Sequence, residues 1–181
     1  MLRGKESTLK GLADLAYKKP VHSRDNYVLV ADNGHGTRIY RDYHNNDIAV
    51  IERGTQSLTD IGTNIHAAIS GMKSTNRFKK SKQFVEDFAK KNNFNASDFT
   101  FSGHSMGSAN ANALADHFKS QKVTAFNPPL YHDVPQIGKL FIGEKDFITK
   151  PSAFLFNRKV KDPIIIPGAG HTLSDIPDSF Q

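Results

Sequence analysis

The sequence predicts an α/β fold whose central sheet is mostly parallel. Strand-like apolar segments alternate with helical segments from residue 57 to residue 126, and this alternation is typical of parallel sheets with helices packed on their faces. Ahead of that region, residues 27–52 have the pattern of strands joined by tight turns, which predicts an antiparallel edge. A third observation concerns residues 103–107, where a serine stands between two glycines at a strand-to-helix turn.

Length and composition limit the class of protein. With 181 residues the chain can bury a core of its own, so we expect one domain spanning residues 1–181. The absence of cysteine excludes disulfides, a thiolate nucleophile and cysteine-zinc sites. The first 20 residues lack the apolar segment and cleavage site of a secretory signal. These features favour an intracellular or particle-associated setting.

The formal net charge is +6, which raises the question of an anionic partner. The densest basic run, residues 77–82, begins a helical segment and contains a single aromatic residue. We therefore interpret it as a solvated helix face, and we expect no nucleic-acid partner. Transient contact with an anionic lipid surface is compatible with this charge.

The first 52 residues predict one helix followed by a strand hairpin. The helix lies within the first 20 residues and presents one apolar face, formed by Leu9, Leu12, Leu15 and Ala16. Strands are expected at residues 27–31, 37–43 and 47–52. Asn45 and Asn46 suit the tight reversal between the last two.

The rest of the chain predicts further helices and strands. A helix is expected at residues 57–70, with apolar residues at helical spacing: Leu58, Ile61, Ile65, Ala68 and Ile69. A second spans residues 80–91 and turns three apolar side chains inward: Phe84, Val85 and Phe88. Strands are expected at 99–103, 122–126, 139–142 and 159–166, with a helix at 106–118. We expect the helices to cover both faces of the sheet.

The turn Gly103-His104-Ser105-Met106-Gly107 has the pattern of a nucleophile elbow. A tight strand-to-helix turn crowds the positions two before and two after its apex, so glycine is favoured at both. Ser105 at the apex is then exposed above the sheet, in front of a helix N-terminus. The backbone N–H of Met106 is available to an oxyanion.

A serine nucleophile needs a histidine base, and three histidines follow it. His117 falls near the far end of the next helix, where a surface or capping role is expected. His132 follows the strand at 122–126 too closely for the usual order of the three residues along the chain, so it is a weak candidate for the base. His171 stands in a glycine-rich loop after the last predicted strand and is the favoured base.

In α/β hydrolases the orienting acid falls between the serine and the histidine along the chain. Asp146 follows the strand at 139–142, and the apolar residues after it return the chain to the core, so it is the favoured acid. Four weaker alternatives remain: Glu144, Asp133, Asp162 and Asp175. Asp175 also suits a capping role in the final segment.

Two further segments carry a resemblance to a known family. IAVIERGTQSLTDIGTNI at residues 48–65 and FSGHSMGSANANALA at 101–115 resemble the lipase class 3 family of α/β hydrolases. In that family a strand ends in Arg-Gly-Ser/Thr, here Arg53-Gly54-Thr55, and a small polar residue and an acid follow, here Ser57 and Asp60. The resemblance covers roughly residues 27–175.

The resemblance implies an α/β-hydrolase fold and a set of site residues. It implies Ser105 as nucleophile, Asp146 as orienting acid and His171 as general base, with Thr55 and Met106 forming the oxyanion hole. A lid or acyl-contact wall is expected along the amphipathic segment after Thr55, at Leu58, Ile61 and Ile65. No metal or organic cofactor is expected.

The sequence therefore predicts a serine carboxylic-ester hydrolase that acts on a lipid ester. The chain is short for the family and lacks tryptophan, so short- or medium-chain esters, phospholipids and monoglycerides are substrates as plausible as triglycerides. An acyltransferase or thioesterase could use the same three residues. The alternative from another class is a catalytically silent α/β-hydrolase-like module that binds lipid or protein.

Overall fold

Eight strands form one mixed sheet within the part of the chain that the structure, a computed structural model, describes: residues 4–18, 23–55, 71–131, 133–149 and 162–178. The strands lie side by side in their order along the chain. They are β1 Ser23–Arg24, β2 Tyr27–Asp32, β3 Thr37–Asp42, β4 Ile48–Glu52, β5 Thr100–His104, β6 Val123–Phe126, β7 Lys139–Gly143 and β8 Ile164–Ile166.

The sheet is antiparallel at one edge and parallel beyond it. Strands β1 to β4 pair antiparallel, and β4 to β8 pair parallel. Between β3 and β4 the chain reverses at Asn46, whose φ of 61° lies in the left-handed region that asparagine tolerates. The predicted α/β fold, with a mostly parallel sheet and an antiparallel hairpin edge, is confirmed.

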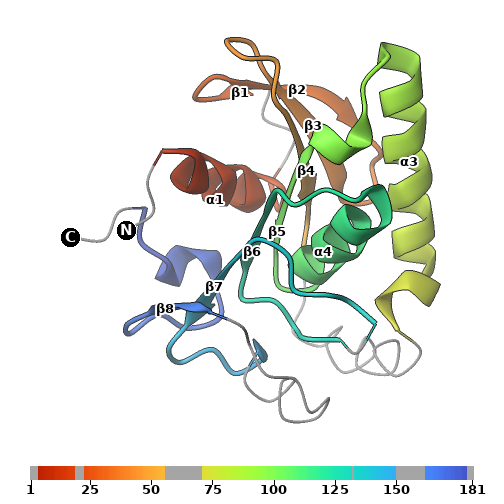
Figure 1. Cartoon of the computed structure of the whole chain (residues 1–181). Coiled ribbons are helices and arrows are strands. Elements are labelled where there is room, and N and C mark those ends of the chain that lie inside the picture. Colours follow the sequence, from red (N-terminus) through yellow and green to blue (C-terminus); the bar gives the residue numbers. More distant parts are fainter. Residues whose placement is uncertain (1–3, 19–22, 56–70, 132, 150–161, 179–181) are drawn as a thin grey trace.

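Helices cover both faces of the sheet (Figure 1). Helix α1, Lys5–Leu15, packs on one face, and α3, Asn76–Asn92, and α4, Met106–Phe118, lie on the other. Alternation along the strands divides the core accordingly. In β4, Val50 belongs to the cluster with α3 and α4, whereas Ile51 belongs to the cluster with α1.

Two expected elements differ from the structure by more than one residue at an end. Helix α3 begins four residues earlier than predicted, because the Thr75 side chain caps it by accepting a 3.1 Å hydrogen bond from the Phe78 N–H. The last strand, expected at 159–166, is only Ile164–Ile166; Asp162 has a φ of 45° and Pro163 has no N–H to donate, while 159–161 lie outside the described residues. The helix expected at 57–70 also lies outside them.

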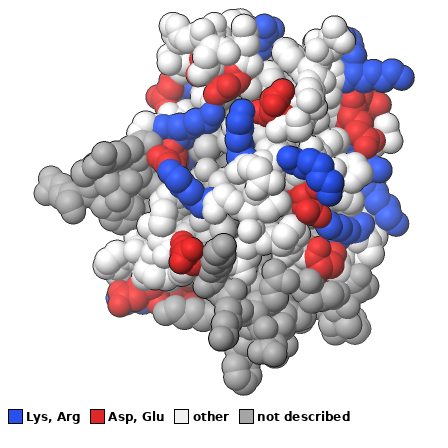
Figure 2. All heavy atoms as spheres, in the orientation of Figure 1, with Lys and Arg blue, Asp and Glu red and all other residues white. Residues whose placement is uncertain are grey.

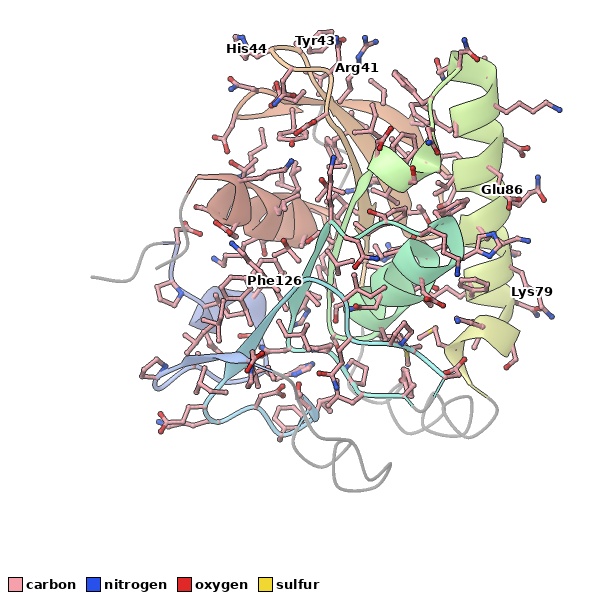
Figure 3. All side chains as sticks on the ribbon, in the orientation of Figure 1. Arg41, Tyr43, His44, Lys79, Glu86 and Phe126 are labelled. Atoms are coloured by element: carbon pink, nitrogen blue, oxygen red, sulfur yellow. The ribbon has the colours of Figure 1, made fainter. Side chains whose placement is uncertain are left out.

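The basic run at 77–82 is not wholly solvated, which corrects the interpretation from sequence. Arg77 reaches into the protein and donates to the backbone carbonyl of Arg53, and it lies 3.4 Å from the fully buried Glu52 carboxylate. Lys79 lies exposed on the outer side of α3, where Glu86 also projects (Figure 3).

Charges of both signs are interspersed on the face drawn in Figure 2, where acidic side chains lie among the basic ones. On α3, for example, Glu86 lies 3.8 Å from Lys82 and 3.2 Å from His117. Among the described residues, no helix combines the length and apolar character that a membrane span needs.

Parallel pairing brings the carboxyl ends of five strands to one edge of the sheet, where α/β proteins place their sites. The segments that follow β4, β5, β6, β7 and β8 contain Thr55, Ser105, Asn127, Asp146 and His171, respectively. The topology therefore gathers polar groups that are up to 116 residues apart along the chain, from Thr55 to His171.

Candidate active site

Ser105 lies at the apex of the turn between β5 and α4 in a conformation that few side chains adopt. Its φ is 53° and its ψ is −131°. A Cβ added at Gly107 would lie 2.2 Å from the Glu52 carbonyl oxygen, and one at Gly103 would lie 2.6 Å from the same atom. Both flanking positions must therefore be glycine, as the sequence pattern predicts, because the turn packs directly against the end of β4.

Three side chains from three loops form a continuous hydrogen-bonded row. The Ser105 Oγ lies 2.9 Å from His171 Nε2, and His171 Nδ1 lies 2.7 Å from Asp146 Oδ1. Since a carboxylate can only accept, Nδ1 carries the proton and Nε2 accepts from the serine hydroxyl. All three residues are less than 8% exposed. The row has the geometry that base-assisted activation of a serine requires.

The loop after β7 holds the Asp146 carboxylate in place. The Ile148 N–H donates to Oδ1 at 2.9 Å, and the Thr149 N–H at 3.2 Å and Thr149 hydroxyl both donate to Oδ2. Burial alone would raise the pKa of Asp146, but the hydrogen bonds from His171, Thr149 and Ile148 outweigh it and hold this pKa below its usual value. Asp146 therefore stays ionised beside the imidazole near neutral pH.

Thr55 and Met106 follow adjacent strands at this edge of the sheet. Thr55 follows β4, and β4 pairs with β5 in parallel register, Glu52 opposite Gly103. Met106 is the first residue of α4, so its N–H is one of the four that an α-helix leaves without an internal partner. The Tyr131 hydroxyl lies 3.1 Å from the Met106 sulfur and supports that side chain.

The other residues considered from sequence lie elsewhere or have other partners. His117 lies near the end of α4 against Glu86, Asp133 accepts from two backbone N–H groups at residues 72 and 73, and Glu144 accepts from the Gly168 N–H. Asp175 completes a capping box at its helical turn. Asp162 is exposed. His132 lies outside the described residues.

Some predicted residues of the site cannot be placed. Leu58, Ile61 and Ile65 of the expected lid, with Ser57 and Asp60 of the family motif, lie outside the described residues. The lid therefore stays a prediction.

Three polar residues that contact the site were not assigned a role from sequence: Tyr17, His104 and Asn127. His104 lies within the Gly-His-Ser motif, and Asn127 follows β6, so position alone was a signal for both. Tyr17 lies beyond the end of α1, and nothing in its local sequence indicates its contact with a residue 87 positions away. Among the described residues, no cluster of three or more potential metal ligands is present.

Comparisons with known proteins support the fold. A crystal structure of a triacylglycerol lipase from Penicillium expansum matches with a TM-score of 0.53 over 92% of this chain and 78% of that chain, at 14% identity. The fold is that of the α/β hydrolases. The weaker matches include a predicted CIB-like hydrolase from Thermoplasma acidophilum, with a TM-score of 0.46 at 16% identity over 84% of this chain and 91% of that one.

A hyperthermophilic esterase from Pyrobaculum calidifontis matches with a TM-score of 0.41 at 12% identity, over 95% of this chain and 83% of that chain. No family model matches the sequence. No curated protein matches it either. The Penicillium expansum match supports the resemblance to lipase class 3 at the level of the α/β-hydrolase fold.

Proposed function

We propose that the protein is a serine carboxylic-ester hydrolase that acts on a lipid ester through an acyl-enzyme intermediate. The observation that carries this proposal is the hydrogen-bonded row from Ser105 Oγ to His171 Nε2 at 2.9 Å and from His171 Nδ1 to Asp146 at 2.7 Å, at the apex of a strained strand-to-helix turn. A strained serine, a base and an oriented acid have no evident purpose in a core that only needs to pack.

In the proposed reaction, Ser105 Oγ attacks the ester carbonyl carbon while His171 Nε2 takes the hydroxyl proton. The new C–O bond moves the carbonyl π electrons to oxygen, and the Met106 and Thr55 backbone N–H groups bind this oxyanion. Each such donor contributes about 3 kcal/mol of transition-state stabilisation. His171 then protonates the leaving alkoxide, and water repeats the sequence to release the acid and restore Ser105.

Lipid esters are the proposed substrate class. The support is the resemblance of the Thr55 and Ser105 segments to lipase class 3, and the Penicillium expansum match is named a triacylglycerol lipase. Contact with a lipid surface and a lid formed by Leu58, Ile61 and Ile65 belong to the same proposal. The reaction needs no metal or organic cofactor.

The test is the initial rate of hydrolysis of p-nitrophenyl esters from acetate to palmitate by wild type and Ser105→Ala. We expect the variant to lose at least about 10³-fold in kcat. Ser97→Ala is the matched control, because Ser97 lies in the helical turn before β5, at the opposite end of that strand. It should keep wild-type rates.

Two results would overturn the proposal. Wild type that hydrolyses no ester, micellar phospholipid included, would favour the silent binding module. Equal rates for wild type and Ser105→Ala would show that Ser105 is not the nucleophile. Transfer of the acyl group to an added alcohol in preference to water would instead indicate an acyltransferase.

A further inference from the structure

A second row of hydrogen bonds runs from Tyr17 through the nucleophile turn to the loop that carries His171. The Tyr17 hydroxyl lies 2.8 Å from His104 Nδ1, and His104 Nε2 lies 2.6 Å from the backbone carbonyl oxygen of His171. The Gly54 backbone packs against the same hydroxyl, because a Cβ added at Gly54 would lie 2.0 Å from its oxygen. Gly54 precedes Thr55 and His104 precedes Ser105, so the row touches the oxyanion segment, the nucleophile turn and the histidine loop.

The chemistry of the groups fixes the direction of each bond. A carbonyl oxygen can only accept, so His104 Nε2 carries the proton and donates to His171. In the neutral ring Nδ1 then has a free lone pair and accepts from the Tyr17 hydroxyl. Burial lowers the pKa of His104 to about 4, so the ring is neutral in the usual assay range. Every group therefore donates toward His171, an arrangement in which successive bonds strengthen one another.

The packing around this row leaves little room for adjustment. A Cβ added at Gly54 would lie 2.0 Å from the Tyr17 hydroxyl oxygen and 2.7 Å from the His104 carbonyl oxygen. The rings of His104 and His171 lie 5.1 Å apart, and His104 is 7% exposed. Burial also raises the pKa of Tyr17 to about 12, so the hydroxyl keeps its proton.

Asn127 is a second hydrogen-bond donor to the same carbonyl. Its Nδ2 donates to the His171 carbonyl oxygen at 2.8 Å and to that of Gly170 at 3.1 Å, while its Oδ1 accepts from the Gly143 N–H at 2.7 Å. Gly143 ends the strand from which the Asp146 loop starts. The His171 backbone is therefore held by two donors, and His104 is the one that connects it to the oxyanion side.

We propose that Tyr17 and His104 are positioning residues that lock the His171 backbone and the Gly54-Thr55 segment in a single register around Ser105. This inference rests on the proposed function. The two residues touch no substrate atom. They hold His171 and the oxyanion segment at the separation that the serine attack needs, and a displacement of about 1 Å in such a geometry costs on the order of 10²-fold in rate.

The test compares four variants with wild type. Tyr17→Phe removes only the hydroxyl, His104→Met removes both hydrogen bonds at similar size, and His104→Gln keeps an N–H donor toward the His171 carbonyl. Tyr40→Phe is the matched control, because Tyr40 is a fully buried tyrosine of the same hydrophobic cluster as α1. Each variant is assayed for kcat and KM on a short p-nitrophenyl ester and for the rate of labelling by a fluorophosphonate.

We expect Tyr17→Phe and His104→Met to lose about 10- to 100-fold in kcat and in labelling rate with KM almost unchanged. His104→Gln should recover most of the loss, and Tyr40→Phe should match wild type. The fraction of molecules that is eventually labelled should stay near complete in every variant. A merely structural role predicts the opposite, namely a smaller labelled fraction at an unchanged rate.

Histidine ¹⁵N NMR tests the row without a substrate. We expect a neutral His104 with its proton on Nε2, and a shift of its Nδ1 resonance in Tyr17→Phe. A proton on Nδ1, or rates for His104→Met equal to those of an active wild type, would overturn the inference. A wild type that neither hydrolyses esters nor reacts with the fluorophosphonate would instead contradict the proposed function. The NMR result would still show whether Tyr17, His104 and the His171 carbonyl form the inferred hydrogen bonds.

Discussion

At the scale of the residue, hydrogen-bond partners decide how the two histidines of the candidate site differ. His171 and His104 are both almost fully buried, but their partners are different. The His171 ring lies between a hydroxyl and a carboxylate, which suits a group that must gain and lose a proton. The His104 ring lies between a phenol and a carbonyl, which suits a group that stays neutral.

The buried His104 makes stability depend on pH. Burial lowers its pKa from 6.5 to about 4, so between these values the unfolded chain binds a proton that the folded chain does not. Stability therefore falls as the pH drops through this window, by up to about 3 kcal/mol from this group. Urea unfolding at pH 7 and pH 4.5 should show a larger drop for wild type than for His104→Gln.

The control for this comparison is His35→Gln, which removes an exposed imidazole. Its drop in stability between the two pH values should equal that of wild type. If His104→Gln lost as much stability as wild type on acidification, the burial of His104 would not be the cause.

Phe147 is the exposed aromatic residue beside the candidate base. Its side chain is 54% exposed, and its ring centroid lies 5.2 Å from that of His171. An acyl chain or alcohol group of a bound ester that extends from Ser105 across the Phe147 ring would cover the apolar surface of that ring. Phe147→Ala should therefore lower kcat/KM for octanoate several-fold more than for acetate, since ~25 cal/mol is gained for each Å² of apolar surface covered.

Tyr43→Ala is the control for that prediction, because Tyr43 is 63% exposed at the hairpin turn, away from the site (Figure 3). An unchanged ratio of octanoate to acetate rates in Phe147→Ala would show that substrate does not pass over the ring.

At the scale of the element, the strand-to-helix turn packs closely against backbone atoms at the end of β4. Gly107→Ala would force a Cβ to within 2.2 Å of the Glu52 carbonyl oxygen, and backbone atoms cannot yield as a flexible side chain does. We expect a loss of unfolding free energy above about 3 kcal/mol, beyond the usual cost of overpacking. Urea denaturation measures it.

Gly34→Ala provides the matched comparison. Gly34 has a φ of 69° with nothing within 4 Å of its missing Cβ, so only the strain of the left-handed backbone is added. That strain costs roughly 1 kcal/mol. Equal losses for the two variants would contradict the close packing of β5, α4 and β4.

The predicted lid, at Leu58, Ile61 and Ile65, lies outside the described residues, so mutation is the way to test it. Replacing Ile61 and Ile65 by serine should lower rates on long-chain esters more than on short-chain esters, because an apolar wall contacts a long acyl chain over more area. The measurement is the ratio of palmitate to acetate rates in the double variant and wild type. An unchanged ratio would remove the lid hypothesis.

At the scale of the whole molecule, the parts predicted from sequence are those that local pattern determines. The strands around Ser105 and the α4 helix follow from hydrophobic periodicity, and the two glycines of the turn follow from crowding. The β1 strand has two residues and exists through its pairing with β2, so no periodic signal marks it. Thr75, which caps α3, is a local signal for the start of that helix, but the expected start at residue 80 depends on hydrophobic periodicity alone.

Contacts between segments that are far apart along the chain could not be predicted from the sequence. The order serine, acid, histidine follows from the chain, but the approach of Tyr17 to His104 depends on how α1 packs against the sheet. The basic run around Arg77 likewise predicts a solvated side chain. Only the fold shows that Arg77 contacts Glu52 and Arg53. That residues 1–181 form one domain stays a prediction.

Whether Ser105 is an activated nucleophile is tested most directly by mass spectrometry of the protein after reaction with a fluorophosphonate ester. We expect one adduct per chain, located by fragmentation on the peptide that contains Ser105, and no adduct in Ser105→Ala or after unfolding in urea. An unmodified wild type, or an adduct on another residue that persists in Ser105→Ala, would contradict the claim that Ser105 is an activated nucleophile.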